Sequence, residues 1–455
     1  MKVAVIGAGP SGLVTLRYLI SAQTFLGTEP IEALLFKSED TVGGTFQART
    51  YEDGELVSSK QLTSFSDFRL RDDDPDFVSA KRYVEYLHEY CDKFNLWSRI
   101  KLSTAVVSVK PNSMGKGHII AYPFVCSGLH VTPNLPEFPG LQEHVPLHTY
   151  LAVTSPTKKV VMCHRSGFHF APKGTQNSTL TVPLDNARAS LFDTAYVHLL
   201  LRNSNALWTF YDWYIIGEPS PDKNHVSKTS PYISYPYRLN SKKSLVERVR
   251  SGIIQSPIPS TNGRQIDLAP WPESVSPDGK IHFQDNGRPG YQRVKDKHIK
   301  PDIVVCCTGY KQRFPFLDRH HYRTAEESNV WNIWHDRDPT VGFIGFLRPS
   351  LGAIPPLAEM QAQLWILKVV APERVPELRA EDEPHYRLLH GRDSRVGYGI
   401  DHESYVYQLA LDMNSATGFT EIVKRAWERK ELRLVMAWAL GRMYCLSCQW
   451  PYSAL

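Results

Sequence analysis

A glycine-rich turn near the start of the chain constrains the fold more than any other feature of the sequence. The residues Gly7 to Gly12 have the spacing GxGxxG and follow an apolar run, Val3 to Ile6, that is typical of a buried strand. The segment from Ser11 to Ser21 then carries apolar residues at helical spacing, and Ala33 to Phe36 is a second short apolar run. Strand, glycine turn, helix and strand within about thirty residues predict a βαβ unit that binds a dinucleotide.

Each position of this turn has a physical role in such a unit. Gly7 allows the tight turn after the strand, Gly9 lets the backbone approach a pyrophosphate, and Gly12 lets the helix pack closely on the strand. Pro10 and Ser11 stand in the first turn of the helix, whose N-terminus offers backbone amides to phosphate oxygens. We therefore expect all five residues to contact the cofactor.

Length and composition indicate a globular protein with more than one domain. The chain has 455 residues, of which 42% are hydrophobic and 22% charged, and this suggests two or three units of ordinary domain size. The net charge of +5 is spread along the chain without a basic run, so no nucleic-acid partner is expected. Seven scattered cysteines favour reduced thiols, and the glycine turn follows Met1 too closely for a signal peptide, so we expect a cytoplasmic protein.

Metal sites and membrane spans are not indicated. The seventeen histidines, and a lone CxxC from Cys445 to Cys448, lack a paired ligand motif of metal-binding spacing, so no metal is expected. No run of 18 apolar residues is present, so no transmembrane span is expected. Peripheral membrane contact and the oligomeric state are left open by the sequence.

Several further segments, taken together with the glycine turn, give the chain a recognisable pattern. In order along the chain, from Met1 to about Leu367, the sequence resembles a flavin-containing monooxygenase of the dimethylaniline monooxygenase type. In the first of these segments an acidic residue is followed by paired glycines and an aromatic residue. The segments that carry the resemblance are Lys37 to Phe46, Ser64 to Phe68, Cys126 to Gly128, Pro133 to Pro136, Pro139 to Gly140, Cys307 to Tyr310 and Gly352 to Gln361.

The resemblance implies an α/β fold, a two-dinucleotide-binding flavoprotein with a Rossmann-like FAD domain. It also implies FAD and NADPH as cofactors and a small molecule containing nitrogen or sulfur as substrate. In this family NADPH reduces FAD, dioxygen adds to give a C4a-hydroperoxyflavin, and one oxygen atom passes to the substrate. The cofactor performs the difficult chemistry, so no cluster of catalytic side chains is required and no residue is assigned a catalytic role.

The resemblance also implies cofactor contacts outside the first turn. Two positions depart from the family pattern. Lys37 stands where an acidic residue is expected to hold the adenosine ribose, so Glu39 is the alternative acceptor, and Val57 stands where many members have asparagine. The implied contacts are Lys37, Glu39, Gly43, Gly44, Phe46, Ser58, Ser59, Arg165, Thr308 and Gly309.

The largest departure from the family pattern follows His148. The family continues with a strand, a second GxGxxG and a helix that bind NADPH, whereas this chain has no second glycine triad. What remains is a strand expected at Lys159 to Cys163, followed by Arg165 at the family's position for the NADPH 2′-phosphate. A βαβ unit needs roughly thirty residues, so we expect a shortened NADPH-type domain. A shortened relative and a gene model with a skipped exon both explain the gap.

We therefore predict three segments and one main function. Residues 1–146 form the first part of the FAD-binding domain, 147–264 a shortened NADPH-type or substrate domain, and 265–455 the returning part of the FAD domain with C-terminal helices. The predicted function is FAD-dependent monooxygenation that uses NADPH. The alternative is an FAD-binding protein that has lost reduction by NADPH, and a flavin oxidase or reductase with another electron donor is a third hypothesis.

Overall fold

The computed structural model divides the chain into two compact units. Unit 1 contains Met1–Val131, Asn177–Leu207 and Gln312–Leu455, and unit 2 contains Thr132–Gln176 and Trp208–Lys311. The division at 146/147 and 264/265 stays a prediction. The structure describes residues 1–51, 54–111, 122–144, 147–148, 160–163, 174–177, 180–183, 266–287, 289–349, 352–376, 399–400, 402–416, 423–424, 427–428 and 430.

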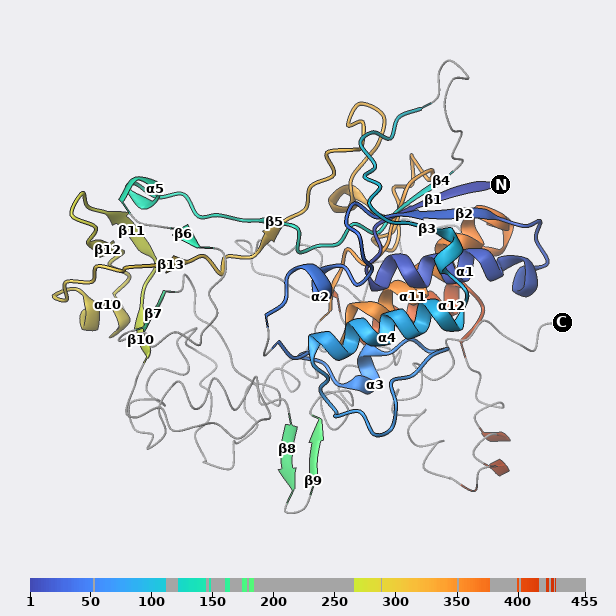
Figure 1. The fold of residues 1–455 in the computed structure, drawn as a ribbon, viewed down its shortest axis with the longest axis horizontal. Helices are drawn as coiled ribbons and strands as arrows, with labels where there is room; N and C mark the ends of the chain where they lie inside the picture. Colours follow the sequence, from blue (N-terminus) through green and yellow to red (C-terminus); the bar gives the residue numbers. More distant parts are fainter. Residues whose placement is uncertain are drawn as a thin grey trace. The chain divides into compact units, whose positions relative to one another are not determined.

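Unit 1 is built on a five-stranded parallel sheet in the order β15-β4-β1-β2-β3 (Figure 1). The central strand β1 pairs with β2 on one side, and with β4 on the other side. Strand β15 comes from the C-terminal half of the chain and completes the sheet beside β4. The predicted α/β fold class is confirmed. The strands are β1 (Lys2–Ile6), β2 (Glu32–Phe36), β3 (Ile100–Lys101), β4 (Tyr122–Val125) and β15 (Gly342–Phe343).

Helix α1 (Pro10–Leu26) follows β1 directly and is longer than the sequence predicted. It begins with Pro10, whose fixed φ suits the first helical position and whose missing N–H costs no helical bond there. It ends at Gly27, which adopts a left-handed conformation with φ of 65° and donates its N–H to the carbonyl of Gln23 at 3.0 Å. Strand, glycine turn, helix and strand are confirmed as predicted.

Two further helices of unit 1 begin at start signals that the sequence carries, which are the N-cap candidate Ser79 and the proline pair Pro355 and Pro356. Helix α4 (Ala80–Lys93) is capped by Ser79, whose hydroxyl accepts from the backbone N–H of Arg82 at 3.1 Å. Helix α11 (Ile354–Val370) has proline in its first turn and is almost entirely buried. The remaining helical segments of unit 1 are α2 (Thr45–Ala48), α3 (Lys60–Thr63), α12 (His402–Asp412) and the short 3₁₀ turns Trp97–Arg99, Ala325–Glu327 and Pro372–Arg374.

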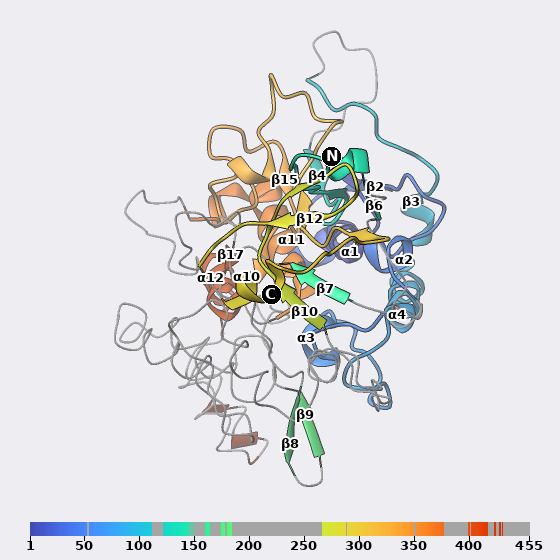
Figure 2. The ribbon, with the colours of Figure 1, turned by 90° about the vertical axis from the view of Figure 1, so that its left-hand side faces the viewer.

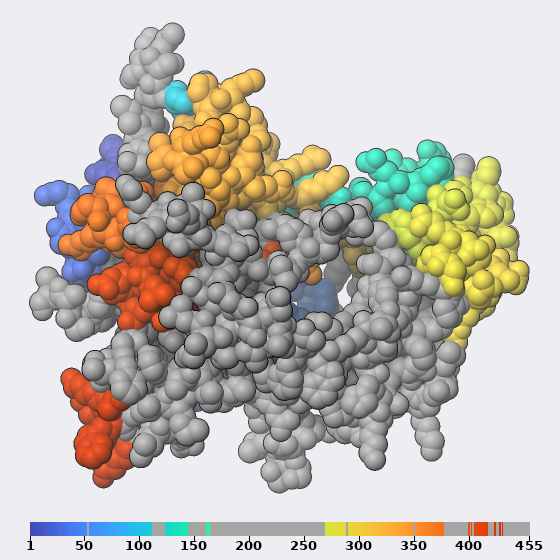
Figure 3. Space-filling model, turned by 180° about the vertical axis from the view of Figure 1, so that it is seen from behind, coloured from blue at the N-terminus to red at the C-terminus, as the bar shows by residue number. Residues whose placement is uncertain are grey.

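The main core of unit 1 lies where α1 and α11 pack against each other beneath the sheet (Figure 1). Leu13, Leu16 and Leu19 of α1 and Leu364 of α11 are at most 1% exposed. Helix α12 packs on α11, and Figure 3 shows the orange residues of 312–376 and the red residues of α12 meeting on one face. The N-terminal βαβ unit and the C-terminal helices therefore share one hydrophobic core. The short strands β16 (Arg348–Pro349) and β17 (Gly399–Ile400) also pair with each other.

Unit 2 consists of small two-stranded ladders in its described part. Strand β7, which the sequence predicted, pairs in parallel with β10 (Figure 2). The elements are β5 (Thr132–Pro133), α5 (Leu141–His144), β6 (Leu147–His148), β7 (Val160–Cys163), β10 (Ile266–Ala269), β11 (Pro272–Val275), β12 (Ile281–Phe283), α10 (Pro289–Val294), β13 (Val304–Val305) and β14 (Tyr310–Lys311). Strands β8 (Gly174–Asn177) and β9 (Leu180–Pro183) form a further two-stranded sheet, and β9 falls within the residues of unit 1.

The apolar run from Pro301 to Cys307 predicts a buried parallel strand in unit 2. The parallel pairing is confirmed, because β13 pairs in parallel with β6, but the burial is wrong, and β13 covers only two residues of a two-stranded ladder. Ile303 is 44% exposed and Val305 36% exposed. Apolar composition alone predicted burial, but a strand is covered on both faces only when layers pack on each side of its sheet.

Candidate cofactor site

The predicted phosphate turn is held rigidly between β1 and α1. Gly7 has φ of +111°, donates its N–H to the carbonyl of Phe36 at 2.9 Å, and lies so near the backbone that a Cβ would stand 2.4 Å from the Cys126 oxygen. A Cβ on Gly12 would stand 1.8 Å from the Gly7 oxygen. Both positions therefore require glycine for the fold itself, before any cofactor binds.

Gly9 differs from its two neighbours in the motif because it faces open space. Among the residues that the structure describes, a Cβ there would meet only the Cα of Gly44, at 3.7 Å. Gly44 is brought to this place by the loop after β2, where Gly43 donates its N–H to the carbonyl of Ala8 at 2.9 Å. The structure thus brings together the first glycine turn and the paired glycines that the sequence singled out.

The N-terminus of α1 has the features that a phosphate group needs. The N-cap residue is Gly9, so no side chain forms a hydrogen bond that caps the helix. No acidic residue stands in the first turn. The hydroxyl of Ser11 makes no hydrogen bond within the described part of the chain, so it can donate to a phosphate oxygen along with the first amides. Together with the space in front of Gly9, these residues fit the pyrophosphate of FAD.

The end of β2 carries an ion pair where the adenosine ribose is expected. The ammonium of Lys37 contacts the carboxylate of Glu39, and the side chain of Lys37 is only 11% exposed. Burial alone would raise the pKa of Glu39, but hydrogen bonds from Lys37 and Ser38 outweigh it and lower that pKa to about 2. Glu39 is therefore a carboxylate at neutral pH, and part of its capacity to accept hydrogen bonds is taken by Lys37.

The other predicted contacts in unit 1 follow the end of β2 along the chain. The ring of Phe46 packs edge-on against Tyr83, with centroids 4.8 Å apart. The hydroxyl of Ser58 is 2.8 Å from that of Thr63, and Ser59 is fully buried at the start of α3. These contacts fix the segments, and their roles toward a cofactor stay predictions.

Three of the predicted site residues lie elsewhere. Thr308 and Gly309 belong to unit 2, where the Thr308 hydroxyl donates to the Asn134 carbonyl and the Asn134 N–H donates to the Gly309 carbonyl at 2.9 Å. Arg165 lies outside the described residues. The contacts of these three residues with a nucleotide therefore stay predictions.

A buried carboxylate in unit 1 was missed by the sequence reasoning. Glu359 of α11 is 1% exposed and accepts a hydrogen bond from the Tyr18 hydroxyl at 2.7 Å, and from the backbone N–H of Ser66 at 2.9 Å. Burial raises the pKa of Glu359, the charge of Asp67 raises it further, and the value reaches about 7 despite these hydrogen bonds. Asp67 itself lies 3.4 Å from the guanidinium of Arg17.

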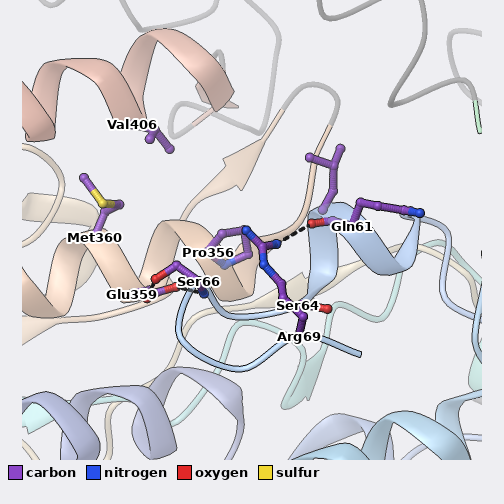
Figure 4. A pocket seen from close by; sticks show the side chains of 9 residues that line it. Gln61, Ser64, Ser66, Arg69, Pro356, Glu359, Met360 and Val406 are labelled. Carbon is purple, nitrogen blue, oxygen red and sulfur yellow. Dashed lines mark hydrogen bonds between the residues drawn. The ribbon is translucent and has the colours of Figure 1, made fainter. Parts of the chain in front are cut away.

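Glu359 also lines a small pocket (Figure 4). Its polar lining comes from α3 and the loop that follows, and includes Gln61, Ser66 and Arg69, whose guanidinium donates to the Gln61 carbonyl at 3.0 Å. Its apolar lining includes Met360 of α11. The only signal of this cluster in the sequence was that Ser66, Asp67 and Glu359 fall inside two of the segments that carry the family resemblance.

A second missed feature lies directly beside the phosphate turn. Gly345, which follows β15, has φ of +84°, and a Cβ there would stand 2.2 Å from the Ser11 hydroxyl oxygen. The backbone N–H of Gly345 donates to the side chain of Gln361 at 2.8 Å. No local pattern could have found this approach, because 334 residues separate Gly345 from Ser11 in the chain (345 − 11).

Comparison with known proteins agrees with this geometry. The sequence profile of the flavin-binding monooxygenase-like family matches residues 1–149. The monooxygenase cfoE of Aspergillus candidus is 43% identical over 521 aligned positions, which cover 97% of this chain and 88% of that protein. That alignment is longer than the 455 residues of the chain, so cfoE has residues at positions where this chain has none.

Solved structures share the fold at low sequence identity. The S-allyl-L-cysteine S-oxygenase from Allium sativum has a TM-score of 0.55 and 16% identity, covering 96% of this chain and 97% of that one. The complex of OTEMO with FAD and NADP has a TM-score of 0.51 and 12% identity, covering 82% and 84%.

Proposed function

Because this chain belongs to the flavin-binding monooxygenase-like family, we propose that it binds FAD in unit 1, uses NADPH, and inserts one oxygen atom into a small molecule containing nitrogen or sulfur. Membership of the family makes the chain a flavin-dependent monooxygenase. The substrate class and the mechanism implied by the family resemblance are the parts that we propose. The expected cytoplasmic location stays a prediction, and none of the described helices has the length and apolar character that a membrane span requires.

One observation carries the proposal: the phosphate turn is complete, and it is open where a pyrophosphate must approach. A Cβ on Gly7 or Gly12 would collide with neighbouring backbone, whereas in the described part of the chain a Cβ on Gly9 would meet only Gly44, at van der Waals distance. A glycine turn that only connected a strand to a helix would not need open space at its middle position. The N-terminus of α1 adds a favourable dipole and unpaired amides.

In this arrangement the protein binds and orients, and FAD, when bound, supplies the redox chemistry. The amides of α1 and the Ser11 hydroxyl would hold the phosphates. The end of β2, with Lys37 and Glu39, would face the adenosine ribose. The paired glycines at 43 and 44 let the loop after β2 lie close against the turn, because a Cβ on Gly44 would stand 2.9 Å from the Cα of Gly9.

A second candidate function is favoured by the length of the alignment with cfoE. Residues are missing relative to that monooxygenase, and the second glycine triad of the family is absent from this sequence. An FAD-binding protein that NADPH reduces poorly or not at all would result if the missing residues were those of the NADPH cradle. Helix-terminal amides supply much of phosphate binding, and Arg165 alone would not replace them.

The experiment that separates the two functions follows NADPH, dioxygen, hydrogen peroxide and product in the same reaction. The purified FAD-loaded protein is mixed with NADPH and either a thioether or a tertiary amine. We expect a sulfoxide or N-oxide whose formation requires both NADPH and dioxygen. No oxidation of NADPH would support the second function instead. Oxidation of NADPH that yields hydrogen peroxide and no oxygenated product would show that NADPH reduces the flavin, and would contradict the proposed oxygenation.

A further inference from the structure

We propose that Gln361 is a positioning residue for the FAD phosphates, which acts by holding Gly345 against Ser11. The inference rests on the proposed binding of FAD at the first glycine turn. It assigns a role to a residue of α11 that lies far from the motif in sequence and that has no part in the turn itself.

Gln361 is fixed at both ends of its amide group. Its side-chain oxygen accepts the N–H of Gly345 at 2.8 Å, and its side-chain nitrogen donates to the hydroxyl of Tyr405 at 2.9 Å. The Tyr405 hydroxyl in turn donates to the carbonyl of Trp331. Gln361 and Tyr405 are both 0% exposed, so these bonds are formed away from water and each lost partner leaves a buried polar group.

The other end of this network reaches the phosphate turn by direct contact. Gly345 is buried and has the left-handed φ of +84°, and the space beside its Cα is filled by the side chain of Ser11. A Cβ at position 345 would stand 2.2 Å from the Ser11 oxygen and 3.1 Å from the Ser11 Cβ. The backbone at Gly345 therefore packs against the Ser11 side chain and limits the directions that its hydroxyl can take.

Ser11 connects the packing at Gly345 to the binding of the cofactor. It stands in the first turn of α1, where the proposed phosphate would reach its backbone amide and its hydroxyl. If the Gly345 N–H lost its acceptor, the turn would shift to find another, and the Ser11 hydroxyl would lose its fixed direction. Helix α12, which carries Tyr405, is in this way connected to the phosphate site through two hydrogen bonds and one van der Waals contact.

The test is a double-mutant cycle on FAD affinity, with deflavinated protein titrated with FAD and followed by the quenching of flavin fluorescence. Gln361→Met keeps the size of the side chain but leaves the Gly345 N–H unpaired, and we expect the FAD dissociation constant to rise about tenfold. In the Ser11→Ala background the same change should raise it less than about threefold, because the group that Gly345 positions is gone. Tyr405→Phe should act in the same direction as Gln361→Met, but more weakly.

Leu409→Ala is the control for a general loss of stability, since Leu409 lies on α12 in the same core and is 0% exposed. It should lower the melting temperature of the apoprotein without raising the FAD dissociation constant. Equal effects of Gln361→Met in the wild-type and Ser11→Ala backgrounds would overturn the inference while leaving FAD binding intact. Failure of the wild-type protein to bind FAD would instead overturn the proposed function.

Discussion

Gly44 lies against Gly9 so closely that a Cβ on Gly44 would stand 2.9 Å from the Cα of Gly9. The reverse is not true, because a Cβ on Gly9 would meet Gly44 at 3.7 Å, an ordinary van der Waals distance. Gly44 also has φ of +60°, which disfavours other residues. Of these two glycines, Gly9 has room for a Cβ and Gly44 does not.

The space beside Gly9 and the close packing of Gly12 predict different results for substitutions at these two positions of the motif, one affecting FAD binding and the other affecting folding. Gly9→Val should give a folded protein that no longer retains FAD, because its side chain fills the space of the pyrophosphate. Gly12→Ala should impair folding itself, since its Cβ would stand 1.8 Å from the Gly7 oxygen. Far-ultraviolet circular dichroism and flavin absorbance of the purified variants distinguish the two. A yellow Gly9→Val protein with stoichiometric FAD would show that the cofactor lies elsewhere.

The Lys37–Glu39 ion pair predicts that FAD affinity can be improved. In the double variant Lys37→Glu, Glu39→Gln a carboxylate replaces the ammonium at the end of β2, with no like charge beside it. We expect it to bind FAD more tightly by about 1 kcal/mol, roughly fivefold, because one hydrogen bond to a ribose hydroxyl is gained. Glu39→Gln alone is the control. If the double variant bound FAD with unchanged or weaker affinity, the adenosine ribose would not lie at the end of β2.

Glu359 predicts a pH dependence of stability with a definite sign. Its pKa is about 7 in the folded protein against an ordinary value of 4.5, so the folded state keeps a proton that the unfolded chain releases between these values. The contribution of Glu359 to the free energy of unfolding therefore decreases as the pH rises from about 4.5 to about 7, by about 3 kcal/mol in total. The groups that face it are Tyr18, Ser66 and Asp67. Asp67 also has a raised pKa, because burial outweighs the effect of the nearby Arg17 guanidinium.

Urea denaturation of Glu359→Gln and of the wild type at pH 5 and pH 8 measures this contribution. We expect the free energy of unfolding of the wild type to fall relative to the variant over this range. Glu39→Gln is the matched control, since a carboxyl with a pKa of about 2 stays ionised throughout. Parallel pH profiles for the wild type and Glu359→Gln would mean that the carboxyl titrates normally.

The sequence predicted the βαβ unit well because its determinants are local. The strand before Gly7, the proline at the start of α1 and the Ser79 cap each depend on residues within a few positions. The contacts of Gly345 with Ser11 and of Glu359 with Tyr18 depend on pairing between the two ends of the chain, which no local periodicity encodes. The exposed strand β13 was misjudged for the same reason, since burial depends on what packs over a strand.

The missing second glycine triad predicts weak binding of NADPH. Arg165 can offer the 2′-phosphate a bidentate contact, but the pyrophosphate has no glycine cradle in the sequence. We expect a dissociation constant above about 1 mM, which corresponds to less than about 4 kcal/mol of binding, and a further loss in Arg165→Ala. A poorly held nucleotide shields the flavin less well, so part of the NADPH consumed should appear as hydrogen peroxide. Micromolar affinity with product matching consumption would show that another segment supplies the cradle.

Reduction of the bound FAD by NADPH can be followed through the flavin absorbance under anaerobic conditions. The FAD-loaded protein is mixed with several millimolar NADPH in the absence of dioxygen, with dithionite reduction as the reference for complete bleaching. We expect the visible flavin band to bleach with NADPH and to return when dioxygen is admitted. An oxidised spectrum that persists in NADPH, while dithionite bleaches the same sample, would contradict this expectation.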